Sequence, residues 1–511
     1  MFKITVFFMK PYLLWILCVQ GEKTIIISSD GFRWDYYRPG EFPGIDQIRM
    51  HGVQVKNLIN SFATVTFPNH FTLVTGLYED HHGIIDNEMY DPQFDETFDM
   101  GTTDPKWWGN GEPIWVTSTK AGLKSVCVNW VGCSIPIQDI RPTYWAPFDG
   151  SIDYKERVDT IADKINGDAE LGLLYFEEPD HSCHIYGPES DQVATAIKKV
   201  DETLQYLLRK VDLNNVNIIF TSDHGGYEVS NKRVVVLESF TRIPFRLVAG
   251  GAVGHLWPVD ENTDFGNIMN DLDRINPDQA RCFLKKDIPD RLHYSSNRRI
   301  APVVCIATLG WTILKTHEEK ERFSLKGSHG YDSSIDINSP MRPVFVAGGP
   351  SFKKQLASEP PFDPVQSIHV FPLLANLLNL RSASVPKVDG ELESISIILK
   401  KSEGAVMSHE EKERFSLKGS HGSDSSIDVN SPTRPEFLAG SPSLKKQLAS
   451  EPPFDLFKSI HVFPGLAKLL NLRSESVPKV DGELESISII KKKAEGDEKE
   501  GEAMFPERVQ F

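Results

Sequence analysis

Six carboxylate and imidazole residues stand where apolar stretches end or in short Gly-flanked loops. An Asp lies at or next to the end of the stretches TIIISSD (24–30), GLLYFEEPD (172–180) and NIIFTSDH (217–224), and the three candidate His residues are the last His of DHSCH and the His of SDHGG and GSHGYD. Mixed Asp and His ligation suits zinc, with other first-row metals as alternatives. Alone, each residue also fits a cap or a turn. The candidate ligands are Asp30, Asp180, His184, Asp223, His224 and His329.

Thr66 is a candidate nucleophile, because it stands at the predicted start of a helix. It precedes Phe67-Pro68 in ATVTFPNHFTLVTG, and Pro favours the first helical turn. The free N–H groups and dipole of that helix would favour a phosphoryl group beside Thr66. A threonine hydroxyl is a weak nucleophile, and a metal can activate it, as zinc lowers the pKa of bound water from about 15.7 to about 7. The alternative role for Thr66 is a helix N-cap.

The three apolar stretches are predicted to be central strands, since continuous apolar runs suit a sheet buried on both faces. A helical pattern lies between two of them, at 191–210. This alternation predicts an α/β fold with a mostly parallel central sheet flanked by helices. In such sheets the site lies beyond the carboxyl ends of the strands, where Asp30, Asp180 and Asp223 fall. Asp180 and His184 are expected in a loop after their strand.

Composition limits the partners. The chain has 511 residues, a formal net charge of -16, 40% hydrophobic and 25% charged residues. That charge argues against long nucleic acids, which are bound mainly through Lys and Arg. A small anionic substrate remains compatible, because bound metal ions can dominate the local charge.

The N-terminus resembles a secretory signal over residues 1–20. Lys3 and Lys10 supply positive charge and 13–17 a short apolar core; a buried N-terminal strand or helix is the alternative. No later segment has the length of a transmembrane span, so we expect a secreted protein without a membrane anchor. One or two disulfides plus a free thiol are expected among Cys127, Cys133, Cys183, Cys282 and Cys305, with the pairing open.

The C-terminal third contains a repeat, because residues 317–398 return at 409–490. The second copy places Glu436 where the first has Val344 in a predicted strand, and a buried carboxylate is costly unless paired. The predicted catalytic domain therefore spans 22–400. The second copy is expected to be peripheral, poorly packed or partly disordered, and the charged tail 491–511 disordered.

Several motifs together resemble those of the ectonucleotide pyrophosphatase/phosphodiesterases, in the alkaline phosphatase superfamily. They are SSDGFRWDYY, TFPNHFTLVTGLYEDHHGIIDNEMYDP, EEPDHSCHIYGP, TSDHGG and GSHGYD. The resemblance runs from about residue 22 to about residue 380. The stretch KKDIPDRLHYSSNRRI at 285–300 is also similar to the short members four and five. The resemblance implies an alkaline phosphatase-like fold.

The resemblance also implies roles for individual residues. Two Zn²⁺ would be bound, one by Asp180, His184 and His329, the other by Asp30, Asp223, His224 and the Thr66 oxygen. Asn87 would stabilise the oxygens of the phosphorane-like state together with the metals. Thr66 would attack phosphorus in line with the leaving alcohol or phosphate, and water would then release the phosphoryl group.

The substrate implied by the resemblance is a small nucleotide phosphodiester. A base would stack between Phe67 and Phe148, with Trp130 as a neighbouring wall, which can contribute about 1–3 kcal/mol per base; ordinary core packing is the alternative. Departures from the family pattern at Val65, at 130–134 and at Cys183 concern substrate preference more than the reaction. Cys183 is expected to be a small neutral residue beside His184.

Three functions are compatible with these residues, in the following order of preference. The first is hydrolysis of dinucleoside polyphosphates, NAD or nucleoside triphosphates to nucleoside 5′-monophosphates. The alternatives are a phosphodiesterase for choline lipids or glycerophosphodiesters, and a non-catalytic secreted binding protein on the same fold. His421 in the second copy competes with His329 as the last ligand, and the apolar strand that follows His329 favours the first copy.

Overall fold

A computed structural model describes residues 21–400. The predicted signal (1–20), second repeat copy (409–490) and tail (491–511) lie outside these residues. Within the described part, no helix has the length and apolar character that crossing a membrane requires.

A six-stranded sheet forms the centre of the molecule. Its strands run in the order β2 (Gly52–Val55), β17 (Phe345–Gly348), β8 (Val216–Thr221), β1 (Lys23–Ser29), β7 (Leu171–Phe176) and β6 (Ser125–Val128). β1 pairs in parallel with β7 and β8, and β6 with β7. β17 is antiparallel to both of its neighbours. The predicted α/β fold with a mostly parallel sheet is confirmed.

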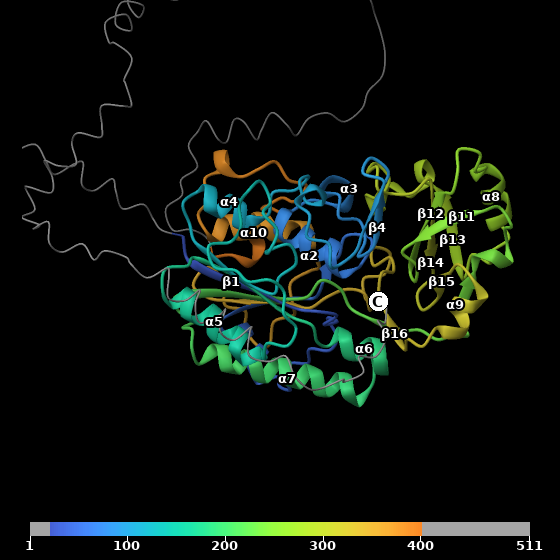
Figure 1. The fold of residues 1–511 in the computed structure, drawn as a ribbon. Helices are drawn as coiled ribbons and strands as arrows, with labels where there is room; N and C mark the ends of the chain where they lie inside the picture. The colour runs from blue at the N-terminus through green and yellow to red at the C-terminus, as the bar shows by residue number, and fades with distance from the viewer. Residues whose placement is uncertain (1–20, 401–511) are drawn as a thin grey trace, which may run out of the picture. The chain divides into compact units, whose positions relative to one another are not determined.

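Both faces of the sheet are covered, which explains the uninterrupted apolar stretches. On β1, Ile25 and Ile27 belong to one hydrophobic core and Ile26 to the other, as the alternation of a strand requires. In Figure 1, α5 (Tyr154–Asn166) and α7 (Asp191–Leu208) lie below β1, and α2 (Thr66–Thr75), α4 (Ile114–Lys120) and α10 (Val370–Leu377) lie above it. The face of the sheet that carries Ile25 and Ile27 also packs against α1 (Pro43–Met50).

The helix predicted at 191–210 is confirmed as α7. The Ser190 side chain accepts a hydrogen bond from the Val193 N–H and caps its first turn. Buried residues then recur at helical spacing, as in Val193, Ile197, Val200 and Leu204.

A second, antiparallel sheet follows the first and was not predicted. Its order is β11 (Phe245–Val248), β12 (Val253–Pro258), β14 (Val303–Ala307) and β13 (Ala280–Leu284). Figure 1 shows these strands beside the main body, with β15 (Thr312–Leu314), α8 (Phe265–Leu272) and α9 (His317–Arg322). We call residues 243–315 the antiparallel lobe.

Two disulfides are present, Cys127–Cys133 and Cys282–Cys305, and Cys183 is the free cysteine of residues 21–400. Cys282 and Cys305 face each other in the register of β13 and β14. The expectation of one or two disulfides plus a free thiol is thus confirmed, with two disulfides formed.

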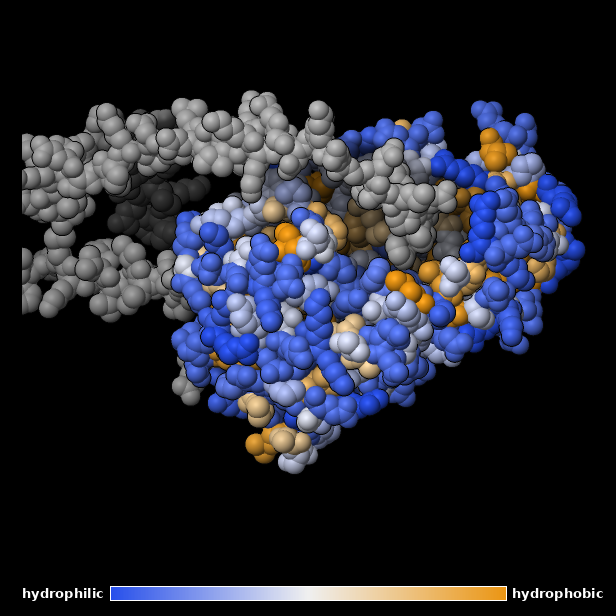
Figure 2. Space-filling model, turned by 60° about the horizontal axis from the view of Figure 1, so that its bottom comes forward, coloured by the Kyte–Doolittle hydropathy of each residue, from blue (hydrophilic) through white to orange (hydrophobic). Residues whose placement is uncertain are grey.

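The remaining strands and α-helices are short, and several lie near the site. They are β3 (Leu58–Ile59), α3 (Glu79–His82), β4 (Met89–Asp91), β5 (Glu96–Phe98), α6 (Asp180–Tyr186), β9 (Tyr227–Glu228), β10 (Val234–Val236), β16 (Gly327–Ser328) and β18 (Val365–Gln366). The face drawn in Figure 2 is largely hydrophilic, with apolar residues in small separate patches.

Candidate active site and metal centre

The carboxyl ends of three neighbouring strands bring the predicted Asp residues together. Asp30 follows β1, Asp223 comes two residues after β8, and Asp180 follows the turn after β7. The backbone joins them: the Asp30 N–H donates to Phe176 O at 2.9 Å, and the Asp180 N–H donates to Asp30 O at 3.0 Å. The parallel register of the sheet therefore positions the site.

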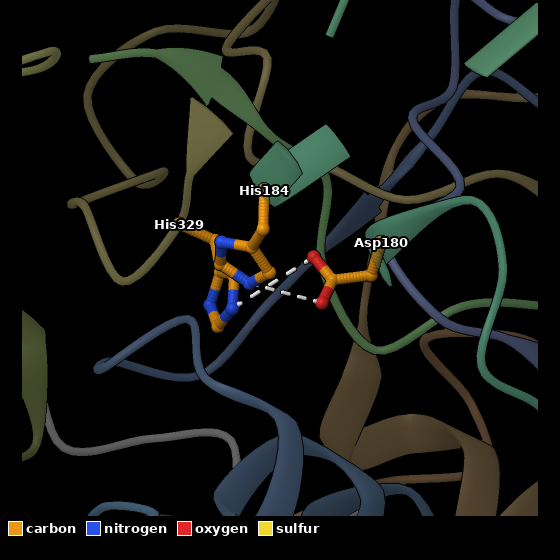
Figure 3. A group of neighbouring side chains, drawn as sticks. All are labelled: Asp180, His184 and His329. Carbon is orange, nitrogen blue, oxygen red and sulfur yellow. Dashed lines mark ion pairs between the residues drawn. The ribbon is translucent and has the colours of Figure 1, made fainter. Parts of the chain in front are cut away.

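One group of candidate ligands is Asp180, His184 and His329, which we call the outer triad. Asp180 Oδ2 lies 3.1 Å from His184 Nε2, and Asp180 Oδ1 lies 3.8 Å from His329 Nε2. Figure 3 shows both imidazoles turned towards the carboxylate, one from α6 and one from the loop after β16.

The expected loop around Asp180 and His184 is wrong. These residues lie on α6, and a separation of four places them on the same side of the helix. α6 has 7 residues, beginning at Asp180 itself, so it offers too little periodicity to predict from the sequence. The helix explains the spacing of the pair better than a loop does.

The other group is Asp30, Asp223 and His224, the inner triad. His224 Nε2 lies 3.3 Å from Asp30 Oδ1 and 3.2 Å from Asp223 Oδ2. The His224 ring stacks on that of His329, with centroids 3.6 Å apart. The two triads therefore adjoin through their imidazoles.

Thr66 lies beside the inner triad. It is the first residue of α2, and Val65 is the N-cap residue, so the N-cap alternative for Thr66 is excluded. Its Oγ1 lies 3.2 Å from His224 Nε2. The helix predicted to start beside Thr66, with Pro68 in its first turn, begins at Thr66 itself, which places the hydroxyl at the N-terminus of α2.

All three imidazoles are oriented in the same way. The Nδ1–H groups donate to backbone carbonyls: His184 to Gly327, His224 to Gly225 and His329 to Thr64, at 2.9, 2.8 and 3.1 Å. Donation through Nδ1 leaves the lone pair of Nε2 directed towards the carboxylates. Metal-binding His residues are commonly fixed by a bond of this kind.

Burial and neighbouring charge shift the pKa values within the inner triad. Burial, and then the charges of Asp223 and Asp180, raise the pKa of Asp30 well above its usual value. Burial would also raise the pKa of Asp223, but His224 and His70 lower it.

In the outer triad, burial opposes ionisation of Asp180, yet His184 and His329 hold its pKa below its usual value. Burial opposes the charge on His184 as well, but Asp180 raises its pKa. Burial, and then His224, lower the pKa of His329 to about 3. His329 is therefore neutral at pH 7, the form that binds metal.

The donor set fits divalent cations. Among residues 21–400, Asp30 Oδ1, Asp180 Oδ1 and Asp223 Oδ2 are buried oxygens that accept no hydrogen bond. A buried anionic oxygen without a donor is costly, and a cation would compensate each of them. Both triads combine carboxylate oxygen with imidazole nitrogen, which suits zinc.

Asn87 lies close to the nucleophile. Its Oδ1 accepts a hydrogen bond from the Phe67 N–H, in the first turn of α2, at 2.8 Å. The amide NH2 of Asn87 is then the part of the side chain that can donate to a substrate oxygen.

A sequence model of the family described as type I phosphodiesterase / nucleotide pyrophosphatase matches residues 24–332. This range contains both triads, Thr66 and Asn87. The chain belongs to the type I phosphodiesterase/nucleotide pyrophosphatase family. It is thus a member of a family of metallo-phosphodiesterases, which are hydrolases.

Relatives of this family cover most of the chain. Human ectonucleotide pyrophosphatase/phosphodiesterase family member 5 is 36% identical over 369 residues, 70% of this chain and 75% of the relative. The bis(5′-adenosyl)-triphosphatase of Xenopus laevis, member four, is 35% identical over 367 residues, 70% of this chain and 78% of the relative. The predicted family and the similarity to members four and five are confirmed.

Solved structures agree with the fold. Human member 5 matches with a TM-score of 0.69 and 33% identity, over 74% of this chain and 100% of that chain. An inactive threonine-to-alanine variant of murine member 5 in complex with AMP also matches, with a TM-score of 0.69, 35% identity and the same coverage. The alkaline phosphatase-like fold is confirmed.

The three predicted aromatic residues lie in different settings. Phe67 packs against Phe98 and Trp108, with centroids 6.0 Å from each. Phe148 is 60% exposed, so its ring is accessible to a ligand. Trp130 is buried and meets His70 edge-on at 5.2 Å. Their roles in substrate binding stay predictions.

Sequence reasoning missed two residues that support the inner triad. His70 Nδ1 lies 2.8 Å from Thr66 O and 3.3 Å from Asp223 Oδ2, and its Nε2 lies 2.9 Å from Ser28 Oγ. The Tyr175 hydroxyl donates to Asp30 Oδ2 at 2.6 Å. The signal for His70 was its place four residues after Thr66 on the predicted helix; Tyr175 lay within an apolar strand and gave none.

Cys183 is buried on α6 beside His184. Burial, and then the charge of Asp180, raise the pKa of its thiol, so the thiol is neutral, as expected. Gly226 and Gly327 both pack against its Sγ. Cys183 therefore fills space between α6 and the β9–β16 pair.

Proposed function

We propose that the protein is a zinc-dependent, secreted hydrolase of nucleotide phosphodiester and pyrophosphate bonds, with Thr66 as the nucleophile. Its substrates would be dinucleoside polyphosphates, NAD or nucleoside triphosphates, and its product a nucleoside 5′-monophosphate. The observation that carries the proposal is the place of Thr66 Oγ1, 3.2 Å from the His224 Nε2 that links the inner triad to the outer one.

The relatives support this chemistry. Member four of Xenopus laevis is named a bis(5′-adenosyl)-triphosphatase. A threonine-to-alanine variant of murine member 5 is inactive and was solved with AMP. In this chain, Thr66 is the threonine whose hydroxyl meets the inner triad.

Two zinc ions are proposed per chain. The outer triad would hold one, and the inner triad with the Thr66 oxygen the other. When bound, zinc lowers the pKa of a coordinated hydroxyl and neutralises charge on the attacking and leaving oxygens.

The protein's own groups would then act as follows. The N-terminus of α2 and the Asn87 amide donate hydrogen bonds to the phosphoryl oxygens. The proton of the Thr66 hydroxyl passes to solvent as Thr66 Oγ1 bonds to phosphorus, while the bond to the leaving oxygen breaks and that oxygen takes up a proton from water to leave as alcohol or phosphate. Water then attacks the same phosphorus, releasing the nucleoside 5′-monophosphate and restoring the Thr66 hydroxyl.

Substrate selection is proposed to rest on Phe67 and Phe148, with Trp130 behind them. The exposure of Phe148 supports this, because an exposed aromatic ring can stack on a base. The AMP complex of the murine relative supports a nucleotide ligand.

Secretion is proposed from the N-terminal segment 1–20 and from two disulfides, which persist mainly in oxidising compartments.

Release of p-nitrophenol from a nucleoside 5′-p-nitrophenyl ester, compared with p-nitrophenyl phosphorylcholine, tests the proposed substrate in zinc-loaded protein. We expect turnover of the nucleotide ester. Preference for the choline ester would assign the choline-phosphodiesterase function instead. Turnover of neither would favour a non-catalytic binding protein.

A further inference from the structure

The segment 293–299, within KKDIPDRLHYSSNRRI, has no part in the proposed chemistry, yet it packs against the loop that carries Asn87. That loop runs from Gly83, the C-cap of α3, to Asp91, the last residue of β4. Asn87 is its midpoint, four residues from each end. The lobe therefore contacts a loop that reaches the nucleophile.

Arg299 joins the two ends of this loop. Its side chain is 1% exposed, and that of Asp91 is 0% exposed. Its Nε donates to Asp91 Oδ2 at 2.7 Å, and its Nη1 donates to Gly83 O at 2.5 Å and to Trp107 O at 2.9 Å. Because a guanidinium is a rigid, planar fork of donors, one side chain fixes the separation of both ends.

Tyr294 holds the loop near its centre. Its hydroxyl donates to Ile85 O at 2.8 Å, two residues before Asn87. The hydroxyl oxygen of Tyr294 also lies 3.1 Å from His255 Nε2 on β12, so the contact is anchored in the antiparallel lobe. The Asn87 loop is thus held at its start, centre and end by one segment of the lobe.

Arg298 offers a contrast at the same carboxylate. Its Nη2 donates to Asp91 Oδ2 at 2.7 Å, but its side chain is 38% exposed. Its hydrogen bonds to the loop all go to Asp91, so Arg298 neutralises Asp91 without spanning the loop.

We propose that Arg299, assisted by Tyr294, is a positioning residue that holds the Asn87 amide in register with Thr66 for phosphoryl transfer. The inference rests on the proposed function and deepens it. Hydrogen-bond donors act on a transition state only when their geometry is fixed in advance, and a displacement of about 1 Å can cost roughly 100-fold in rate.

The test begins with Arg299→Lys in the full chain. Lysine keeps the charge opposite Asp91, but its single ammonium cannot span the loop. We expect kcat for the nucleoside ester to fall roughly 10- to 100-fold while KM stays within about 3-fold. The matched control Arg298→Lys should keep kcat within about 3-fold, because lysine keeps the charge beside Asp91 and Arg298 does not span the loop. An unchanged kcat in Arg299→Lys would overturn the proposal.

A double-mutant cycle with Asn87→Ala separates positioning from general damage. If Arg299 acts through Asn87, Arg299→Lys lowers kcat far less in the Asn87→Ala background. Equal losses in both backgrounds would contradict the proposal. Thr66→Ala distinguishes failure of the proposed function from failure of the positioning role. If Thr66→Ala is active, the proposed function itself is wrong. If Thr66→Ala is inactive but Asn87→Ala is fully active, only the positioning role of Arg299 is wrong.

Tyr294→Phe decides the question if Arg299→Lys does not fold. It removes one hydroxyl and keeps the ring. The control Tyr37→Phe removes another buried hydroxyl, which donates to Asp46. We expect kcat to fall roughly 3- to 10-fold for Tyr294→Phe, again only with Asn87 present, and to stay at the parent value for Tyr37→Phe. Equal kcat for both variants would overturn the proposal.

Discussion

The inner and outer triads contain similar ligands but differ in burial. In the inner triad, the side chains of Asp30, Asp223 and His224 are 4%, 0% and 0% exposed. In the outer triad, Asp180, His184 and His329 are 13%, 12% and 9% exposed. The inner triad is therefore enclosed by protein, and the outer one reaches solvent.

The difference in burial indicates that the two triads have different roles in the reaction. The inner triad is tied to the nucleophile's helix through His70 and to β7 through Tyr175. The outer triad comes from α6 and the loop after β16, whose side chains remain partly accessible. We infer that the inner site holds Thr66 and the outer site meets the substrate and water.

Removing a ligand from each triad tests this difference in roles. Asp223→Asn should lower the zinc content from two ions to one per chain and lower kcat by roughly 1,000-fold or more. The effect is large because the buried inner site has no solvent to replace the lost charge. Asp180→Asn should also lose one zinc but destabilise the fold less. Zinc analysis and thermal unfolding measure both. A larger fall in Tm for Asp180→Asn would reverse the assignment of inner and outer sites.

The support given by His70 is expected to have a smaller effect. His70→Gln keeps a polar side chain but loses the imidazole that lies between Thr66 O and Asp223 Oδ2. Loss of such an outer-shell partner commonly costs about 10- to 100-fold in metal affinity or activity. Competition with a zinc chelator would show weaker binding at one site only. Unchanged zinc affinity at both sites would show that His70 does not support metal binding at the inner triad.

Zinc binding should depend on pH in a defined direction. Asp30 in the inner triad and His184 in the outer one have raised pKa values, so protons compete with zinc for these side chains more strongly than they would for the free side chains. A raised pKa stabilises the metal-free fold at low pH, and that contribution is lost as pH rises through the folded pKa. The increase in Tm on adding zinc should therefore grow with pH. An increase that shrinks as pH rises would contradict these assignments.

The smallest effect is expected in the second repeat copy. His421→Ala should leave zinc content and kcat unchanged, whereas His329→Ala should lose the outer zinc, because His329 lies 3.8 Å from Asp180. The first copy also buries Val344, where the second has Glu436. Loss of zinc only in the His421→Ala variant would show that His421, and not His329, is the ligand of the outer zinc.

The sequence predicted the parts of the site that depend on strand ends. Asp30, Asp180 and Asp223 follow strands whose apolar runs are visible because both faces are buried. α6 was missed because a single short helix shows no periodicity. The antiparallel lobe was missed because β11 and β13 mix buried and exposed residues. The links of Tyr175 to Asp30 and of Arg299 to Gly83 join residues 145 and 216 positions apart, which local patterns cannot reveal.

The most direct test of the central claim is the activity of zinc-loaded Thr66→Ala. We expect this variant to keep its fold and to retain both zinc ions or bind the inner one more weakly. Its kcat on the nucleoside ester should fall roughly 10,000-fold or more, with Thr66→Ser keeping part of the activity. Parent-level kcat in Thr66→Ala would contradict the account.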